Sequence, residues 1–246
     1  MESLVVERCG SGTIPPGLCV MLLGTFTCLL DADIEPAPGM LRALREKMRR
    51  EGIPFVSVTA FPSMSGAWGR LLMPAFVYFF MVLYPFWLVN SSNARVAAAA
   101  GGCILTESRL LEQMGRLESL RSTVIDDCTL ARGIKSDGSR IWLGLPRSAR
   151  SIRNCRHLGE LWNVVARTAF TQLGYSAILL VLCTLVMALA YGVPAELFVF
   201  SDGLQRYLSA AALFVMMITY VLVLRFHERS WLWALSLPLI GALFLP

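Results

Sequence analysis

The sequence has few charged residues and almost no histidine, and its cysteines form no recognisable ligand pattern. Only 16% of its 246 residues are charged, whereas 56% are apolar. This composition is far from that of an ordinary soluble protein. The seven cysteines include no Cys-x-x-Cys pair, and neither of the two histidines stands at ligand spacing from a cysteine. We therefore expect no zinc site and no disulfide framework, which fits a reducing compartment.

Charge is nearly absent from the last third of the chain. All but three of the 22 Lys and Arg residues, and all but three of the 17 Asp and Glu residues, precede Ala169. Residues 169–193 carry no charge and exceed the roughly 20 residues that cross a bilayer. Residues 207–226 are a second candidate, and residues 231–245 are a third span, a tilted helix or a re-entrant segment. The sequence predicts a membrane domain over 169–246 with two or three spanning helices.

The N-terminus also lacks the basic region of a signal peptide. The positive-inside rule places the basic flank ending at Arg167, and the short loop with Arg225 and Arg229, on the cytoplasmic side. The loop at 194–206 would then lie outside, and the polar half of the chain would be cytosolic.

A fourth apolar stretch, at residues 71–89, lies within the polar half. Its length would allow it to span, but Pro74 and Pro85 interrupt it. Its many aromatic residues suit a helix that lies in the bilayer surface. Both interpretations stay open, and the interfacial one is favoured.

The polar half alternates strand and helix patterns. It predicts strands at 25–30, 53–58, 103–106 and 139–145, and helices at 40–50, 107–114 and from Asp126 onward. A strand–helix–strand unit is typical of a parallel α/β sheet, in which ligands bind at the carboxyl ends of strands. Asp31 and Asp33, in "LLDADIEP", stand at such an end.

The two aspartates of this D-A-D stretch allow two interpretations. One is a divalent-cation site, because Mg²⁺ is typically held by one or two carboxylates together with substrate phosphates. The other is the turn and helix-capping chemistry that Asp favours in any protein. The adjacent Asp126 and Asp127 pose the same choice: a carboxylate with a raised pKa that serves as a general base, or a helix N-terminus favoured by the dipole.

Two further features have a functional and an ordinary interpretation. Gly101 and Gly102 either let the backbone approach a sugar or its acceptor, or form a simple turn. The stretch "PRSARSIRNCR" either receives a diphosphate or an anionic headgroup, or is a generic basic patch beside the membrane. Its arginines are Arg147, Arg150, Arg153 and Arg156.

Read together, these features resemble the family-2 membrane glycosyltransferases of the GT-A fold, which include ceramide glucosyltransferase and cellulose synthase. The shared order is D-x-D at a strand end, a Gly-Gly strand, an acidic pair that opens a helix, and an arginine-containing helix that leads into the membrane. The resemblance is closer to the bacterial hopene-associated branch and covers residues 25–176. It rests on "LLDADIEP", "LLMPAFVYFF", "AAAAGGCIL", "IDDCTLA" and "LGELWNVVARTAFTQL".

The resemblance implies a role for each matching residue. Asp31 and Asp33 would bind Mg²⁺ or Mn²⁺ and the diphosphate of a nucleotide-sugar donor. Asp127 would be the general base that activates an acceptor hydroxyl, supported by Asp126, and the transfer would invert the anomeric carbon. Arg167 would contact the leaving diphosphate.

The chain departs from the family pattern at two places. Thr168 and Val164 stand where the family's R/Q-x-x-R-W motif has Trp and Gln or Arg. Only 30 residues precede Asp31, where the family has a much longer segment that supplies the first strands and the nucleotide-base pocket. We therefore expect an atypical segment at 1–24, a partial GT-A (Rossmann-like) α/β domain at 25–168 and a membrane domain at 169–246.

The resulting hypothesis is a multi-pass glycosyltransferase of the bacterial inner membrane that uses a nucleotide-sugar donor and a hopanoid-related lipid acceptor. Other hopanoid-pathway proteins are expected partners, and nucleic acid is not. One alternative is a truncated, non-catalytic homologue, in which a strand edge lacks its neighbours. A remote alternative is a small polytopic transport or scaffold protein, which would need polar residues within its spans.

Overall fold

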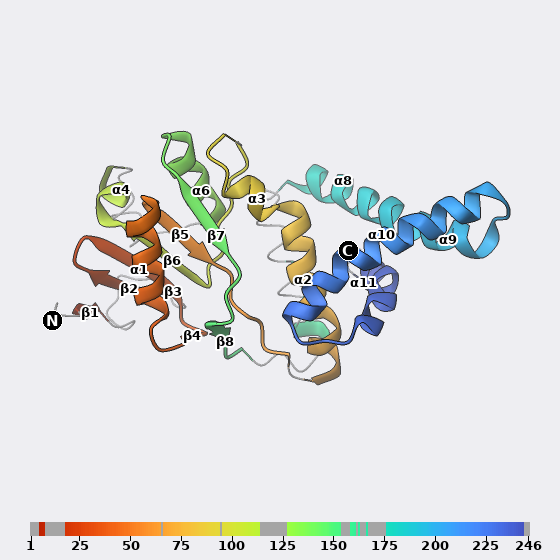
Figure 1. Cartoon of the computed structure of the whole chain (residues 1–246), viewed down its shortest axis with the longest axis horizontal. Coiled ribbons are helices and arrows are strands. Elements are labelled where there is room, and N and C mark those ends of the chain that lie inside the picture. The colour runs from red at the N-terminus through yellow and green to blue at the C-terminus, as the bar shows by residue number, and fades with distance from the viewer. Residues whose placement is uncertain are drawn as a thin grey trace. The chain divides into compact units, whose positions relative to one another are not determined.

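A computed structural model describes residues 5–7, 18–64, 66–93, 95–113, 127–153, 158–160, 162, 166 and 176–243. The predicted site residues Asp126 and Arg167, and the motif positions Val164 and Thr168, lie outside the described residues. The chain divides into two compact units. The first comprises Met1–Ser63 and Leu83–Arg153, and the second comprises Met64–Val82 and Asn154–Pro246. In the described residues the first unit is mixed α/β and the second is helical, which confirms the predicted combination (Figure 1).

The first unit is built on a six-stranded sheet with the order β1-β2-β3-β6-β5-β7. The strands are β1 (Val5–Glu7), β2 (Leu18–Leu23), β3 (Phe26–Asp31), β5 (Phe55–Val58), β6 (Cys103–Glu107) and β7 (Ile141–Gly144). β5 and β7 are parallel, and every other pair is antiparallel. A separate two-stranded sheet joins β4 (Ile34–Pro36) to β8 (Ala149–Ser151).

The predicted parallel arrangement is correct for β3 and β5 but not for the strand between them. β3 and β5 run the same way, and β6 lies between them and is antiparallel to both. As a result, Cys103 at the start of β6 pairs with Leu30 of β3 and Val58 of β5, near the carboxyl ends of those strands. This reversal brings the preceding Gly101 and Gly102 to the edge where a ligand would bind.

β3 lies inside the sheet. All six residues of β2 pair with β3, across a turn at Gly24 and Thr25. The central residues of β3, Thr27–Leu30, are buried, as expected of a strand with neighbours on both sides.

Helices cover the sheet on both faces. α1 (Met40–Glu51) buries Met40, Leu44 and Met48 against a cluster that includes Val56 and Leu105, whereas Leu41 of the predicted apolar face is only half-buried. The helix ends at a left-handed glycine, a common helix terminator. α6 (Asp127–Ser136) and α4 (Ser108–Gln113) begin close to their predicted starts. α6 buries Cys128, Leu130, Ala131 and Ile134.

Among the described residues after 154, the second unit contains two long apolar helical runs. α8 (Ala177–Met187), the π-helix η1 (Ala188–Gly192) and α9 (Val193–Phe200) form one continuous run, and α10 (Leu204–Phe226) forms the other. The predicted loop at 194–206 is therefore wrong, since only residues 201–203 separate the runs. Pro194 lies within this continuous run, directly after the π-helical turn η1, and such local π adjustments are how apolar helices accommodate a proline. Residues 169–175 of the predicted span lie outside the described part.

In the part of the chain that the structure describes, three helical runs are long and apolar enough to cross a membrane, as expected of a membrane protein. They are Gly66–Leu83, Ala177–Phe200 and Leu204–Phe226. The shorter stretch that follows forms a 3-10 turn, η2 (Trp231–Ser236), and α11 (Leu237–Leu243).

The aromatic stretch predicted at 71–89 forms α2 (Gly66–Leu83) and the short α3 (Phe86–Val89). Pro74 lies inside α2 without ending it, whereas Pro85 separates the two helices. Tyr78 and Thr219 share a hydroxyl hydrogen bond of 3.0 Å, and the rings of Tyr78 and Tyr220 are 5.2 Å apart. α2 therefore packs on α10 within the second unit.

Candidate active site

Three residues predicted from separate motifs meet at one point. Asp31 is the last residue of β3, Gly101 lies in the turn before β6, and Asp127 is the first residue of α6. A Cβ placed on Gly101 would lie 2.7 Å from Asp127 Oδ2 and 2.8 Å from Asp31 Oδ2. The two carboxylates therefore face the same small volume, on either side of a residue that has no side chain.

A side chain added at Gly102 would meet backbone atoms, whereas one added at Gly101 would meet side-chain oxygens. A Cβ on Gly102 would lie 2.6 Å from the amide nitrogen of Ala60 and 2.7 Å from the carbonyl oxygen of Val58. Only glycine fits this approach to the chain leaving β5. Gly102 thus seats the turn against the sheet, and Gly101 faces the carboxylates.

Asp31 has an unusual electrostatic environment. Burial, followed by repulsion from the Asp33 carboxylate, raises the pKa of Asp31 to about 6, and Arg153 partly opposes this shift. A carboxylate disfavoured by desolvation and by a second carboxylate is stabilised by a cation placed between them. A bound cation would therefore stabilise the ionised forms of Asp31 and Asp33.

Asp33 lies against β8 and the residues that follow it. Ser151 Oγ donates to Asp33 Oδ2 at 3.4 Å, and Arg153 Nε lies 3.8 Å from the same oxygen. The amide of Ile152 donates to the Asp33 carbonyl at 2.8 Å. The β4–β8 pairing, which aligns Ile34 with Ser151, creates these contacts.

Arg153 is the functional residue that sequence reasoning identified only as part of a basic patch. The other described arginines of that patch, Arg147 and Arg150, are exposed, and Arg150 Nε donates to the Arg147 carbonyl at 3.4 Å. The regular spacing of the arginines was the one available signal, and it does not distinguish Arg153 from its neighbours. Its place beside Asp33 depends on a strand pair that joins segments over a hundred residues apart.

Asp127 lies at the acidic N-terminus of α6, as the helix interpretation predicts, and its role as a general base stays a prediction. Its carboxylate opens the helix, where the dipole favours negative charge, and it also faces Asp31 across Gly101. The helix dipole favours the ionised form, which is the form that accepts a proton.

The donor set fits a hard divalent cation. Within the described residues, no cluster of three or more His, Cys, Asp or Glu side chains is placed to hold a metal. Mg²⁺, however, is usually held by one or two carboxylates, with phosphates and water completing the shell. Asp31 and Asp33 supply that number of carboxylates.

Fold and site together define an α/β protein with membrane helices and a carboxylate-lined site at the carboxyl ends of its strands. The family model of glycosyl transferase family 21 matches residues 25–243. Because this match covers most of the chain, the protein belongs to that family of glycosyltransferases. The expected glycosyltransferase assignment is confirmed, although the matching family is numbered 21 rather than 2. No curated protein and no solved structure matches the chain.

Proposed function

We propose that the protein transfers a sugar from a nucleotide-sugar donor to a lipid acceptor, with inversion at the anomeric carbon. The observation that carries this proposal is the meeting of Asp31 and Asp127 across Gly101. Membership of a glycosyltransferase family supports the reaction class, and the long apolar helices support an acceptor drawn from the membrane.

Asp127 is the general base of the proposed reaction. Its carboxylate takes the proton of the acceptor hydroxyl, whose oxygen forms a bond to the anomeric carbon. The bond from that carbon to the diphosphate oxygen breaks on the opposite face, and the diphosphate leaves with the electron pair. Gly101 leaves room for the reacting atoms between the two carboxylates. Asp126, the neighbouring acid, is proposed to support the base.

Arginines are proposed to bind the diphosphate. Arg153 lies beside Asp33, and its side chain is 57% exposed, so its guanidinium can reach a ligand. Arg167 is proposed for the same role from the resemblance of its motif. Guanidinium groups bind phosphate oxygens through paired, charge-assisted hydrogen bonds.

Asp31 and Asp33 are the residues that would hold Mg²⁺ or Mn²⁺. A divalent cation, when bound, supplies charge that neutralises the donor diphosphate. For the protein, the consequence is relief of the repulsion that raises the Asp31 pKa.

The finer assignment rests on sequence resemblance. Strings such as "AAAAGGCIL" and "LGELWNVVARTAFTQL" support a partial GT-A domain of the family-2, hopene-associated type. We therefore propose a hopanoid-related acceptor, a bacterial inner-membrane location and a cytosolic α/β unit.

The test is a transfer assay on the full-length protein in detergent with a panel of nucleotide sugars, Mn²⁺ and hopanoid-containing lipid extract. We expect lipid glycosylation by the wild type and a loss of about 100- to 10,000-fold in kcat for Asp127→Asn. Asp137→Asn, an exposed aspartate just beyond the same helix, is the matched control and should keep wild-type activity. A folded wild type that is inert toward the whole panel would contradict the proposal and favour the non-catalytic homologue.

A further inference from the structure

The segment that delivers Gly101 to the site has no regular secondary structure. We call residues 95–100 the strap. Its alanines Ala97, Ala98 and Ala99 are 5%, 1% and 1% exposed, so the strap runs through the interior of the unit. A buried segment outside a helix or sheet needs other partners for its backbone groups.

Side chains from α6 and β5 supply those partners. Lys135 Nζ donates to the carbonyl of Val96 at 2.7 Å, and Cys128 Sγ donates to that of Ala99 at 3.4 Å. Ser57 Oγ accepts from the amide of Ala100 at 2.8 Å and donates to its carbonyl at 3.0 Å. The strap is thus held at its start by α6 and at its end by both α6 and β5.

Lys135 also joins the strap to a second element. Besides Val96, its ammonium donates to the carbonyls of Val89 at 2.6 Å and Leu88 at 3.4 Å. It therefore joins the end of α3 to the start of the strap. Desolvation by burial lowers the Lys135 pKa, so placing the charge here has an energetic cost. All three partners of the ammonium are backbone carbonyls, and we call these three hydrogen bonds the clasp.

The helix that carries Lys135 also carries Asp127. The two residues are eight positions apart on α6, about two turns. The Lys135 ammonium fixes the strap to α6. The strap leads directly into Gly101, against which the Asp127 carboxylate lies. One rigid helix therefore sets the position of both the base and the glycine that faces it.

We infer that Lys135 is a positioning residue, which holds the strap and α6 in the register that seats Gly101 between Asp31 and Asp127. This inference rests on the proposed function. It predicts that loss of the clasp lowers kcat through misplacement of the base and leaves the KM for the donor unchanged. A displacement of about 1 Å is enough to lower a rate by roughly 100-fold.

The main variant is Lys135→Met, which keeps the length of the side chain and removes its donors. The matched control is Arg132→Met, which removes an exposed cation from the same helix. A second control, Leu130→Ala, removes packing of a fully buried side chain of α6 and keeps the Lys135, Cys128 and Ser57 side chains that bond the strap. Lys135→Arg restores a charged donor.

Two measurements are made on full-length protein in detergent: steady-state kinetics, and hydrogen exchange of the amides at 96–102. We expect Lys135→Met to lose about 10- to 100-fold in kcat, with unchanged donor KM and faster exchange confined to 96–102. Lys135→Arg should recover part of the kcat. Arg132→Met should match the wild type, and Leu130→Ala should exchange faster throughout the sheet with a smaller loss of kcat.

Unchanged exchange at 96–102 in Lys135→Met would overturn the inference, whatever the activity. It would also be overturned by a kcat equal to that of Arg132→Met, or by a loss no greater than that of an equally destabilised Leu130→Ala. An inert wild type is a different result, since it contradicts the proposed function itself.

Discussion

At the scale of single residues, the buried Asp31 carboxylate lowers the free energy of unfolding when it is ionised. Its pKa is about 6 in the folded protein, against an ordinary value of 3.8. Between these values the folded state binds more protons than the unfolded state, so rising pH lowers the free energy of unfolding. We expect Asp31→Asn to be more stable than the wild type by about 1 to 3 kcal/mol at pH 8, with the difference gone by pH 4.

The measurement is urea unfolding of both proteins in detergent, without divalent cations, at several pH values. Asp137→Asn, at an exposed position, should show no such trend. A difference between Asp31→Asn and the wild type that is equal at pH 4 and pH 8 would contradict the raised pKa.

Alanine substitutions at the two adjacent glycines should have different effects, one on transfer activity and the other on stability. In Gly101→Ala the new Cβ meets carboxylate oxygens, which can move, so the fold should survive while transfer falls at least about tenfold. In Gly102→Ala the Cβ meets the backbone around Ala60, which cannot yield without shifting strand ends, and about 1 to 3 kcal/mol of stability should be lost.

Thermal unfolding and transfer assays on both variants separate the two effects. Gly159→Ala is the control, because a Cβ there meets nothing within 4 Å. If Gly101→Ala kept full activity, the volume between the carboxylates would not be the reacting volume.

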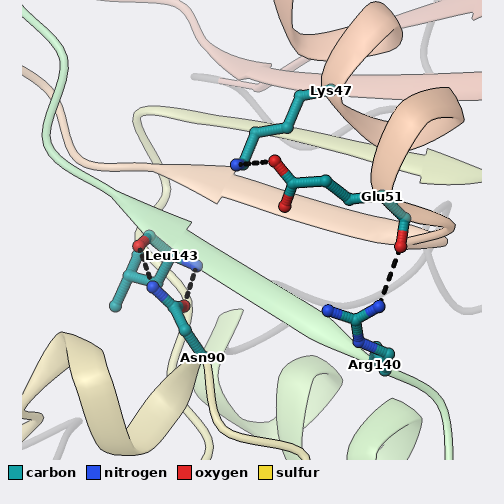
Figure 2. A network of polar contacts seen from close by, with 5 residues as sticks. All are labelled: Lys47, Glu51, Asn90, Arg140 and Leu143. Carbon is teal, nitrogen blue, oxygen red and sulfur yellow. Dashed lines mark hydrogen bonds and ion pairs between the residues drawn. The ribbon is translucent and has the colours of Figure 1, made fainter.

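At the scale of elements, β7 is an edge strand of the sheet, and side chains complete its hydrogen bonding (Figure 2). The Asn90 side chain donates to the Leu143 carbonyl at 3.1 Å and accepts from the Leu143 amide at 2.7 Å, as a neighbouring strand would. At the start of β7, Arg140 donates to the Glu51 carbonyl at 2.8 Å. Edge strands without such partners tend to pair with other chains.

We expect Asn90→Leu to lower the free energy of unfolding by about 2 kcal/mol, because it leaves two buried backbone groups without their partner. Asn93→Leu introduces the same side chain at an exposed position of the same loop and should be nearly neutral. Urea unfolding measures both, and light scattering shows whether the uncovered edge aggregates. Equal unfolding midpoints for the two variants would show that Asn90 does not cap the edge.

Periodicity predicted most of these elements, but not how they are paired. The patterns of β3, β5, β6 and α1 were sufficient to place them, because each buries its apolar face. The reversed direction of β6 was missed because side-chain alternation is the same in either direction. Contacts such as Arg153 with Asp33 depend on pairing between distant segments. Asp31, Gly101 and Asp127 were predicted because each combines an unusual residue type with an element boundary.

At the scale of the whole molecule, the sheet constrains how α2 meets the membrane. β5 precedes α2 and β6 and β7 follow it, yet these strands pair in one sheet. Before α2, Phe61 is bridged to Arg150, and after it Asn90 is bonded to Leu143. The seven Cα–Cα steps from Leu83 to Asn90 reach at most about 25 Å, less than the roughly 30 Å of a hydrocarbon core. Because both segments that flank α2 join one sheet, we expect the chain to return to the side of the bilayer from which it entered.

We therefore predict that α2 enters and leaves the bilayer on one side, whereas the run Ala177–Phe200 and α10 cross it. Single cysteines at Ser63 and Asn93, which flank α2, should react with an impermeant maleimide from the same face of membrane vesicles. Asp202→Cys, between the two crossing helices, should react from the opposite face. Labelling is measured above that of the unsubstituted chain, which has its own cysteines. If Ser63→Cys and Asn93→Cys reacted from opposite faces, β5 could not pair with β6 and β7. That result would contradict both the sheet and the candidate site built on it.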